Sequence, residues 1–233
     1  MVIYTKMTIN MKMRNIFYLL PVIISIAGCS IDNYEAPSVT LTGKVIDNVT
    51  NDMIENGGVN GGTVIQIFEA KSKQPILSKS FPDGHFVNAA MFPGEYKIIA
   101  VGAFVMAQDT TRITITENTE IEIKVLPNVR LKATIQSYDG ATATVKVEYS
   151  KVHDAQVLNQ LAVVWSTIIN PNLFTFSGGG QKTETVTSQN LTTGEKIFTI
   201  TGLKANTKYY IRAAGRTNAP GSYYNYSTSV VTQ

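Results

Sequence analysis

The sequence predicts an all-β protein with two consecutive β-sandwich domains after a lipoprotein signal peptide. The first 28 residues contain an apolar block that ends directly before the only cysteine, Cys29. Beyond residue 38 the chain consists of short segments that alternate apolar and polar residues, as half-buried strands do. Turn residues separate these segments. None of the segments in residues 39–127 has a helical period. Short strands at this spacing favour sandwiches over a βαβ arrangement.

Residues 1–28 have the composition of a secretory signal peptide. A basic segment, Met13-Arg14-Asn15, precedes an apolar stretch of residues 16–28 that ends in small residues. Pro21 interrupts this stretch, which is shorter than the roughly 20 apolar residues of a membrane-spanning helix. No later segment approaches that length, so the sequence predicts no transmembrane helix.

The end of the leader, Ile26-Ala27-Gly28-Cys29, is similar to the bacterial lipobox. The resemblance implies cleavage before Cys29 and acylation of that cysteine, and its three acyl chains exceed the two signals that stable anchoring needs. The alternative is a signal peptide cut elsewhere, with Cys29 a chance residue. A lone cysteine also excludes internal disulfides. Residues 29–38 lack a hydrophobic period and are predicted to form a lipidated tether.

The leader accounts for the excess of positive charge. Of the 20 basic residues, three (Lys6, Lys12 and Arg14) lie in residues 1–28, which leaves 17 against 17 acidic residues. A neutral mature chain gives no reason to expect nucleic-acid binding. Residues 29–127 hold 12 acidic and 7 basic residues, whereas residues 128–233 hold 5 acidic and 10 basic ones. This asymmetry is either solvated surface charge or a means of docking the domains or a partner.

Residues 39–127 form the first predicted domain. Strands are expected at residues 39–47, 63–69, 76–81, 85–92, 96–101, 112–116 and 120–125. Pro82-Asp83-Gly84 and Pro93-Gly94-Glu95 supply turns between them. The glycines of residues 56–62 indicate a turn rather than a phosphate-binding loop, because no Walker lysine and no helix follow them.

This domain resembles the carboxypeptidase-regulatory or transthyretin-like β-sandwich over residues 39–126. Four elements carry the resemblance in the same order: Gly43-Lys44-Val45-Ile46-Asp47, Val64-Ile65-Gln66-Ile67, Asp83-Gly84-His85-Phe86 and Phe92-Pro93-Gly94-Glu95-Tyr96-Lys97-Ile98. It implies an accessory domain in which Tyr96 begins a central strand and packs inward. The zinc ligands of the enzymes that such domains accompany are absent.

The second predicted domain follows the seam Leu126-Pro127-Asn128 and spans residues 128–233. Strands are expected at residues 143–149 and 162–167, around 209–213, and last at about 226–231. Leu203, Thr207 and Tyr209 resemble the tyrosine corner of fibronectin type III-like domains, although Ala205 stands where that family usually has proline. The resemblance implies that the Tyr209 phenol bonds to upstream backbone.

Taken together, the mature chain resembles a family of two-domain outer-membrane lipoproteins of unassigned activity. Their genes lie beside SusC/SusD-type glycan uptake systems. The tether segments Asp32-Asn33-Tyr34 and Ala36-Pro37 belong to the resemblance, and the acids Asp32 and Glu35 resemble a weak signal for export to the cell surface. The resemblance implies a lipid-anchored, surface-exposed protein of the outer membrane with a SusC/SusD-like complex as partner.

The sequence offers no catalytic constellation. His85 and His153 fall in different domains and have no metal-ligand spacing. No nucleophile elbow is present to anchor a triad. No catalytic residue, metal or cofactor is therefore predicted, and the protein is expected not to be an enzyme. A glycosidase carboxylate pair has no local signature and requires two carboxylates that face each other across a cleft.

Aromatic residues on two loops are the candidate ligand-binding groups. Tyr223, Tyr224 and Tyr226 follow the turn-rich residues 218–222, and Phe174 and Phe176 precede three glycines. Exposed aromatic rings stack on the apolar faces of sugars. The alternative, weighted equally, is that these rings pack under their own loops or against the first domain. Trp165 lies in an apolar strand and is expected in the core.

These observations support a non-catalytic surface lipoprotein that binds glycan for a polysaccharide uptake system. The alternative is an interaction module that docks on a transporter complex and binds no sugar. A glycan-binding protein is expected to expose its loop aromatics, whereas an interaction module is expected to expose an apolar patch or a complementary charged face.

Overall fold

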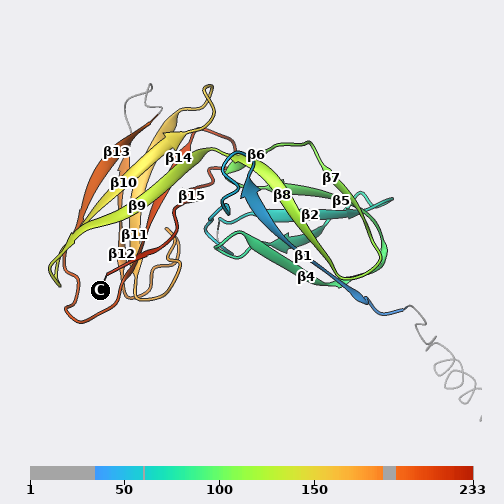
Figure 1. Ribbon diagram of the computed structural model, residues 1–233, viewed down its shortest axis with the longest axis horizontal. Coiled ribbons are helices and arrows are strands. Elements are labelled where there is room, and N and C mark those ends of the chain that lie inside the picture. Colours follow the sequence, from blue (N-terminus) through green and yellow to red (C-terminus); the bar gives the residue numbers. More distant parts are fainter. Residues whose placement is uncertain (1–34, 60, 186–192, 233) are drawn as a thin grey trace, which may run out of the picture. The chain divides into compact units, whose positions relative to one another are not determined.

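The computed structural model describes residues 35–59, 61–185 and 193–232, and these residues contain strands and no helix (Figure 1). The predicted all-β class is confirmed. The predicted signal peptide, the predicted acylation site Cys29 and residues 30–34 of the predicted tether lie outside the described residues. Residues 35–38 are exposed and have no regular structure. No helix long and apolar enough to cross a membrane occurs in the part of the chain that the structure describes.

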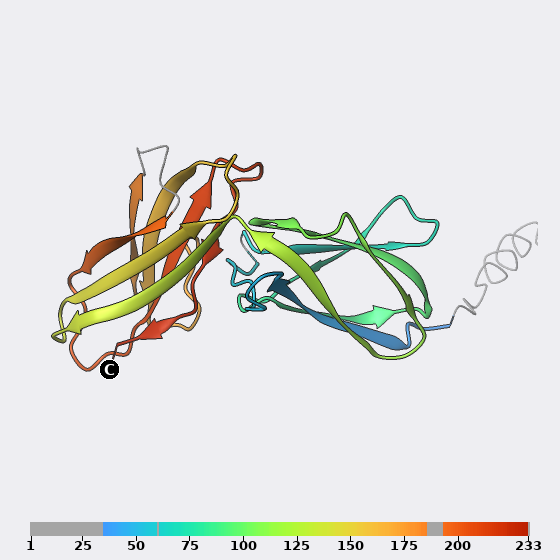
Figure 2. The ribbon, with the colours of Figure 1, turned by 45° about the horizontal axis from the view of Figure 1, so that its top comes forward.

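Eight strands build the N-terminal sandwich, which consists of two four-stranded sheets (Figures 1 and 2). The strands are β1 (Val39–Asp47), β2 (Val64–Glu69), β3 (Ile76–Lys79), β4 (His85–Met91), β5 (Gly94–Val101), β6 (Phe104–Met106), β7 (Thr111–Ile115) and β8 (Thr119–Pro127). One sheet has the order β4-β1-β8-β6, and the other has the order β3-β2-β5-β7. All pairings are antiparallel except that of β1 with β8, which is parallel.

Eight more strands build the C-terminal sandwich. They are β9 (Val129–Tyr138), β10 (Ala143–Lys151), β11 (Leu158–Ser166), β12 (Gly180–Thr185), β13 (Thr193–Ile200), β14 (Tyr210–Thr217), β15 (Asn225–Tyr226) and β16 (Val230–Val231). One sheet has the order β13-β10-β9. The other has the order β12-β11-β14-β15, and β16 also pairs with β14.

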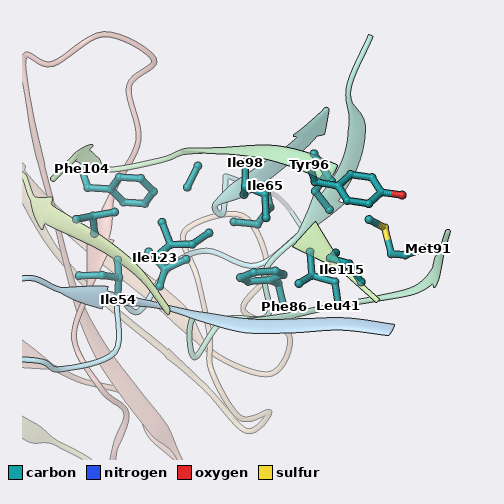
Figure 3. Packing of buried hydrophobic residues seen from close by; sticks show 14 of the residues in the cluster. Leu41, Ile54, Ile65, Phe86, Met91, Tyr96, Ile98, Phe104, Ile115 and Ile123 are labelled. Carbon is teal, nitrogen blue, oxygen red and sulfur yellow. The ribbon is translucent and has the colours of Figure 1, made fainter. Parts of the chain in front are cut away.

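The N-terminal core forms because apolar side chains alternate along strands that face each other. Figure 3 shows Phe86 and Ile123 from one sheet pointing toward Ile65, Ile98 and Tyr96 from the other. All five side chains are buried, and the Tyr96 hydroxyl donates a hydrogen bond to the carbonyl of Phe92 at 2.8 Å. Tyr96 therefore packs inward from a central strand, as the sequence predicts.

Gly43 makes room for the Phe86 ring. A Cβ atom at Gly43 would lie 2.5 Å from the ring tip of Phe86 and 2.7 Å from the carbonyl oxygen of Ile121, both impossible distances. Gly43 and Phe86 are also direct partners between β1 and β4. The close approach of the ring to bare backbone explains a glycine in the middle of a buried strand.

The C-terminal core contains the predicted tyrosine corner. Tyr209 is buried, and its hydroxyl accepts a hydrogen bond from the Lys204 amide at 3.2 Å. Val145 and Val147 of β10 face Val163 of β11 in the same core. Trp165 packs against this core but is only partly buried. The expectation that it contacts the core is confirmed, whereas full burial is not observed.

Several strands differ from the predicted ones. β6, β9, β12 and β13 were not predicted, and the last expected strand, residues 226–231, is two short strands, β15 and β16. The break between them has a physical cause: the carbonyl of Ser227 accepts a hydrogen bond from the Arg212 guanidinium, and its amide bonds back to Ala213. The remaining strands agree within a few residues.

Residues 37–233, both sandwiches included, form one compact unit. An arginine–aspartate pair joins the end of β1 to the start of β9: Arg130 Nε lies 2.6 Å from Asp47 Oδ2, and Arg130 Nη2 lies 3.0 Å from Asp47 Oδ1. The Val129 amide donates to the side-chain oxygen of Asn225 at 3.0 Å. These bonds fix the chain where it passes from one sandwich to the next.

The Asp47–Arg130 pair predicts loss of stability in acid. Burial opposes ionisation of Asp47, but bonds from Arg130 and from backbone amides outweigh it and lower the pKa of Asp47 below its usual value of 3.8. The unfolded chain then binds more protons near that pH, so this stabilisation is present above pH 3.8 and is lost as the pH falls. Urea unfolding between pH 2 and 6 is expected to show a steeper decline in the wild type than in Asp47→Asn. Equal slopes would contradict the assignment.

Candidate functional site

The candidate site lies on the outer face of the sheet β12-β11-β14-β15. Residues directly opposite each other in antiparallel strands point to the same face, so the register defines rows across the three long strands. The rows are Thr185–Gln160–Arg216, Thr183–Ala162–Ala214 and Gln181–Val164–Arg212. The intervening residues, Leu161, Val163, Ile211 and Ala213, point into the core. The outer face therefore carries small apolar residues in the middle and polar residues at its margins.

Aromatic side chains from two loops cover the middle of the outer face. Leu173, Phe176 and Tyr224 pack over a cluster formed by Ala162, Val164, Ala214 and Tyr226. The small side chains of Ala162 and Ala214 leave room for the rings. The sheet is therefore covered by the core on its inner face and by the loop side chains on its outer face. Three of the five predicted aromatic residues, Phe176, Tyr224 and Tyr226, thus meet in one cluster.

Tyr226 belongs to the floor of this cluster, and the prediction that it is an exposed loop residue is wrong. It lies in β15 beside Ala214, is buried, and accepts a hydrogen bond from the Leu173 amide at 3.2 Å. The Arg212 guanidinium lies 4.7 Å from its ring centroid. Burial raises the pKa of Tyr226 to about 12. The residue is an anchor for the loop and has no face open to a sugar.

Phe174 and Tyr223 have different surroundings. Phe174 is 61% exposed, and its ring lies beside Gly61 of the N-terminal sandwich, where an added Cβ would come within 2.9 Å. The half-buried Tyr223 ring lies over Gly221 of its own loop. The Phe174 side chain is therefore mostly exposed, whereas the Tyr223 ring packs on its own loop. Neither ring belongs to the cluster around Tyr226.

Tyr224 connects the aromatic cluster to the polar margin. Its hydroxyl donates a hydrogen bond to Gln160 Oε1, and the Arg216 guanidinium lies over its ring at 5.3 Å from the centroid. Burial raises the pKa of Tyr224, and the nearby charge of Arg216 opposes that rise. Gln160, Arg216 and Tyr224, with the exposed Thr183 and Thr185 of β12, are named the Tyr224 site below.

Two buried polar atoms beside this site have no hydrogen-bond partner among the described residues: Asn159 Oδ1 and Arg216 Nε. The register of β11 against β14 shifts between Leu158 and Gln160, so Asn159 is the extra residue of a β-bulge. Bulges occur often beside binding sites because they redirect a side chain. Unpaired buried polar atoms are rare in folded proteins and need an explanation.

No local sequence pattern singles out Gln160, Arg216 or the two threonines. Each is an ordinary polar residue of a strand, and only the register places them in one row. Alternation within residues 158–166 and 210–217 does indicate which residues share a face. The pairing of the two strands, separated by more than forty residues, is not visible in either segment.

A second candidate is the cavity of about 540 Å³ beside the passage between the sandwiches. Its lining includes Asp52, Glu55, Arg130 and Lys132. The Glu55 carboxylate pairs with Arg212 at 2.7 Å, and Asp47 pairs with Arg130. Burial raises the pKa of Glu55 above its usual value, and the charge of Arg212 offsets only part of this rise. Two of the carboxylates around this cavity are thus bound to arginines of the C-terminal sandwich.

The remaining predictions concern histidines and metals. His85 is exposed on β4, and its Nδ1 lies 3.2 Å from Asp83 Oδ2. His153 is half-buried, with Nε2 at 3.3 Å from the carbonyl oxygen of Leu126. Within the residues that the structure describes, no group of three or more acidic, histidine or cysteine side chains is placed to hold a metal ion.

Comparison with known proteins gives matches in sequence and in fold. No curated protein matches the sequence. Residues 39–126 match a family profile described as "Protein of unknown function (DUF3823) N-terminal domain". A DUF3823 family protein from Bacteroides ovatus has a similar structure, with a TM-score of 0.67 and 20% identity; the match covers 83% of this chain and 98% of that one. One from Parabacteroides merdae has a TM-score of 0.68 and 17% identity, over 85% and 100% of the two chains.

A third structure comes from Bacteroides uniformis and is named as that of a candidate carbohydrate-binding protein. Its TM-score is 0.68 and its identity 14%, and the match covers 84% of this chain and 99% of that one. At these identities the likeness concerns the fold, which extends over both sandwiches. The sequence match is confined to the first of them. Over residues 39–126 the chain is similar in sequence to the DUF3823 N-terminal domain.

Proposed function

We propose that this protein is a non-catalytic glycan-binding lipoprotein and that the Tyr224 site binds the sugar. The observation that carries the proposal is the meeting of a half-exposed aromatic ring with planar polar side chains and hydroxyls on one sheet face. Sugars are recognised by rings that stack on their apolar faces and by amide, guanidinium and hydroxyl groups that bond to their hydroxyls. The name of the Bacteroides uniformis neighbour supports the same class of ligand.

Tyr223 and Phe174 are the further contact residues of the proposed surface. Tyr223 directly precedes Tyr224 and is half-buried, and Phe174 lies on the neighbouring loop and is exposed. Phe176 and Tyr226 support the loops from beneath. The proposal therefore divides the predicted aromatics into contact residues and supporting residues.

Glycan-array binding by the soluble form, residues 30–233, tests the proposal. Wild type is expected to bind at least one glycan, and the variant Tyr223→Ala, Tyr224→Ala is expected to lose that binding, because stacking on such rings is a main source of affinity. Phe81→Ala, which removes an exposed ring of the N-terminal sandwich, is the matched control and should bind as wild type does. Binding by the double variant at wild-type strength would move the site elsewhere, and no binding by wild type would refute the proposal.

The proposed location is the outer membrane, with Cys29 acylated and a SusC/SusD-like complex as partner. The lipobox-like residues before Cys29 support the anchor. Labelling cells with an alkyne-bearing fatty acid is expected to tag the wild-type protein and not the variant Cys29→Ala. Equal labelling of the two would refute acylation at this residue.

A docking function without sugar is the second candidate, and a different observation favours it. Leu77, Phe81 and Val87 of the N-terminal sandwich are exposed apolar residues on or after β3 and on β4. The Ser78 hydroxyl bonds to the Val87 carbonyl at 3.2 Å and joins these strands. Purification of a membrane complex through the wild-type protein, but not through a variant with all three residues changed to serine, would support docking.

A further inference from the structure

We propose that the sugar bound at the Tyr224 site carries an oxyanion, either a uronate carboxylate or a sulfate ester, and that Arg216 is its charge partner. This inference rests on the proposed function, and it specifies the class of ligand. It derives from the different surroundings of two arginines on the same strand face. Both Arg212 and Arg216 project from the outer face of β14, one near the N-terminal sandwich and one at the opposite margin.

The guanidinium of Arg212 has its partners within the protein. Its Nη2 lies 2.7 Å from Glu55 Oε2, and its Nε and Nη1 donate to the carbonyls of Ser227 and Asn56 at 2.8 and 3.2 Å. The side chain has no exposed surface. The charge of Arg212 is therefore used within the protein and is closed to any ligand.

Arg216 forms no ion pair with any of the described residues. Its guanidinium lies over the Tyr224 ring, the residue is half-buried, and its Nε has no hydrogen-bond partner among those residues. The contact with the ring restricts the guanidinium, which lowers the entropy lost when it binds a ligand. An oriented guanidinium without a carboxylate is the group that proteins use to bind oxyanions through two parallel hydrogen bonds.

The surroundings of Arg216 add donors and no negative charge. None of the nine residues in the three rows of the outer face is acidic. Glu184 of β12 alternates with Thr183 and Thr185 and pairs with Lys196 at 2.8 Å. The adjoining segment 186–192 contains no acidic residue in its sequence. A ligand carboxylate or sulfate at this margin therefore meets one uncompensated cation and no fixed anion on the face.

Gln160 completes the donor set. Its Oε1 accepts the Tyr224 hydroxyl proton, so the other polar group of the side chain, the amide nitrogen, is a donor for a ligand. Thr185 adds a hydroxyl in the same row. A neutral sugar offers both donors and acceptors, whereas a carboxylate or a sulfate offers acceptors alone. The donors of Arg216, Gln160 and Thr185 therefore match a carboxylate or a sulfate better than a neutral sugar.

Calorimetric titration with matched pairs of probes tests the inference. One pair is oligogalacturonate and its methyl ester, which differ in the charge of the carboxyl groups. The other is a sulfated carrageenan oligosaccharide and its desulfated form. At least one anionic probe is expected to bind about tenfold or more tightly than its neutral partner, and raising the salt concentration should weaken that binding. The pair that shows the preference identifies the oxyanion as carboxylate or sulfate.

Variants assign the preference to Arg216. Arg216→Gln is expected to abolish the difference between charged and neutral probes, and Arg216→Lys is expected to retain part of it. Lys182→Gln removes the same charge from β12 at an exposed position that does not belong to the outer-face rows, and it should leave the preference unchanged. Unfolding curves for each variant show whether the fold is intact.

Failure of the inference and failure of the proposed function are distinguishable. If wild type binds neutral glycans on the array and prefers none of the anionic probes, the inference is overturned and glycan binding stands. A charge preference that survives Arg216→Gln also overturns it. If no glycan of either kind binds, the proposed function fails and the inference fails with it.

Discussion

Replacing Arg212 by methionine is expected to lower the free energy of unfolding by about 3–5 kcal/mol, the usual loss when one partner of a buried ion pair is removed. The guanidinium is buried between the sandwiches, where Glu55 and two backbone carbonyls bind it and the Tyr226 ring faces it. Methionine leaves the Glu55 carboxylate buried without its partner and two carbonyls without donors. The urea midpoint of unfolding measures the loss.

A double-mutant cycle separates the ion pair from the packing. Glu55→Leu together with Arg212→Met removes both charges, so the double variant is expected to be more stable than Arg212→Met alone. Lys196→Met is the matched control, because both side chains of the Lys196–Glu184 pair are partly exposed and its loss should cost less. A loss below about 1 kcal/mol in Arg212→Met would show that the pair contributes little to stability.

Replacing Phe86 by alanine is expected to destabilise the protein by about 3–5 kcal/mol, as large-to-small changes of buried aromatics do. The ring has no exposed surface and points between the two sheets of the N-terminal sandwich (Figure 3). It occupies the space that a side chain at Gly43 would need. β4, which carries the ring, and β8 both pair with β1 in one sheet, so backbone movement cannot readily fill the cavity that the ring would leave.

Phe81→Ala is the control for this change, since Phe81 is more than half exposed and its truncation should cost much less. Thermal unfolding of the two variants and the wild type gives the comparison. Equal losses in Phe86→Ala and Phe81→Ala would contradict the burial of the Phe86 ring.

Sequence patterns predicted the strands whose two faces differ in polarity. Val39–Asp47 of β1 alternates buried and half-buried residues until it becomes fully buried at its end, and Ala143–Lys151 of β10 alternates up to its last residue. β12 and β13 were missed because they are mostly exposed strands at sheet edges, with polar sequences that resemble loops. β6 has three residues, too few to establish a period. Local alternation therefore predicts central strands better than edge strands.

The candidate site was predicted in part, and the errors have one origin. Residue type alone suggested that Tyr226 and Tyr224 are equivalent, but pairing with Ala214 places Tyr226 beneath the loop. Arg212 lies in a strand as an apparently exposed cation, and its burial depends on Glu55, a residue 157 positions away. Long-range register decides which polar residues meet, and no local pattern contains that information.

The parallel pairing of β1 with β8 determines how the N-terminal sandwich resists a mechanical load. β1 follows the tether, and β8 leads into the C-terminal sandwich. A pull between the tether and the C-terminal sandwich therefore slides the two strands past each other along their length. All the pairs from Leu41–Thr119 to Asp47–Val125 are strained together, whereas a strand peeled from its end loses its bonds one at a time. Because forced unfolding is governed by the unfolding rate, this shear geometry favours slow unfolding under such a load.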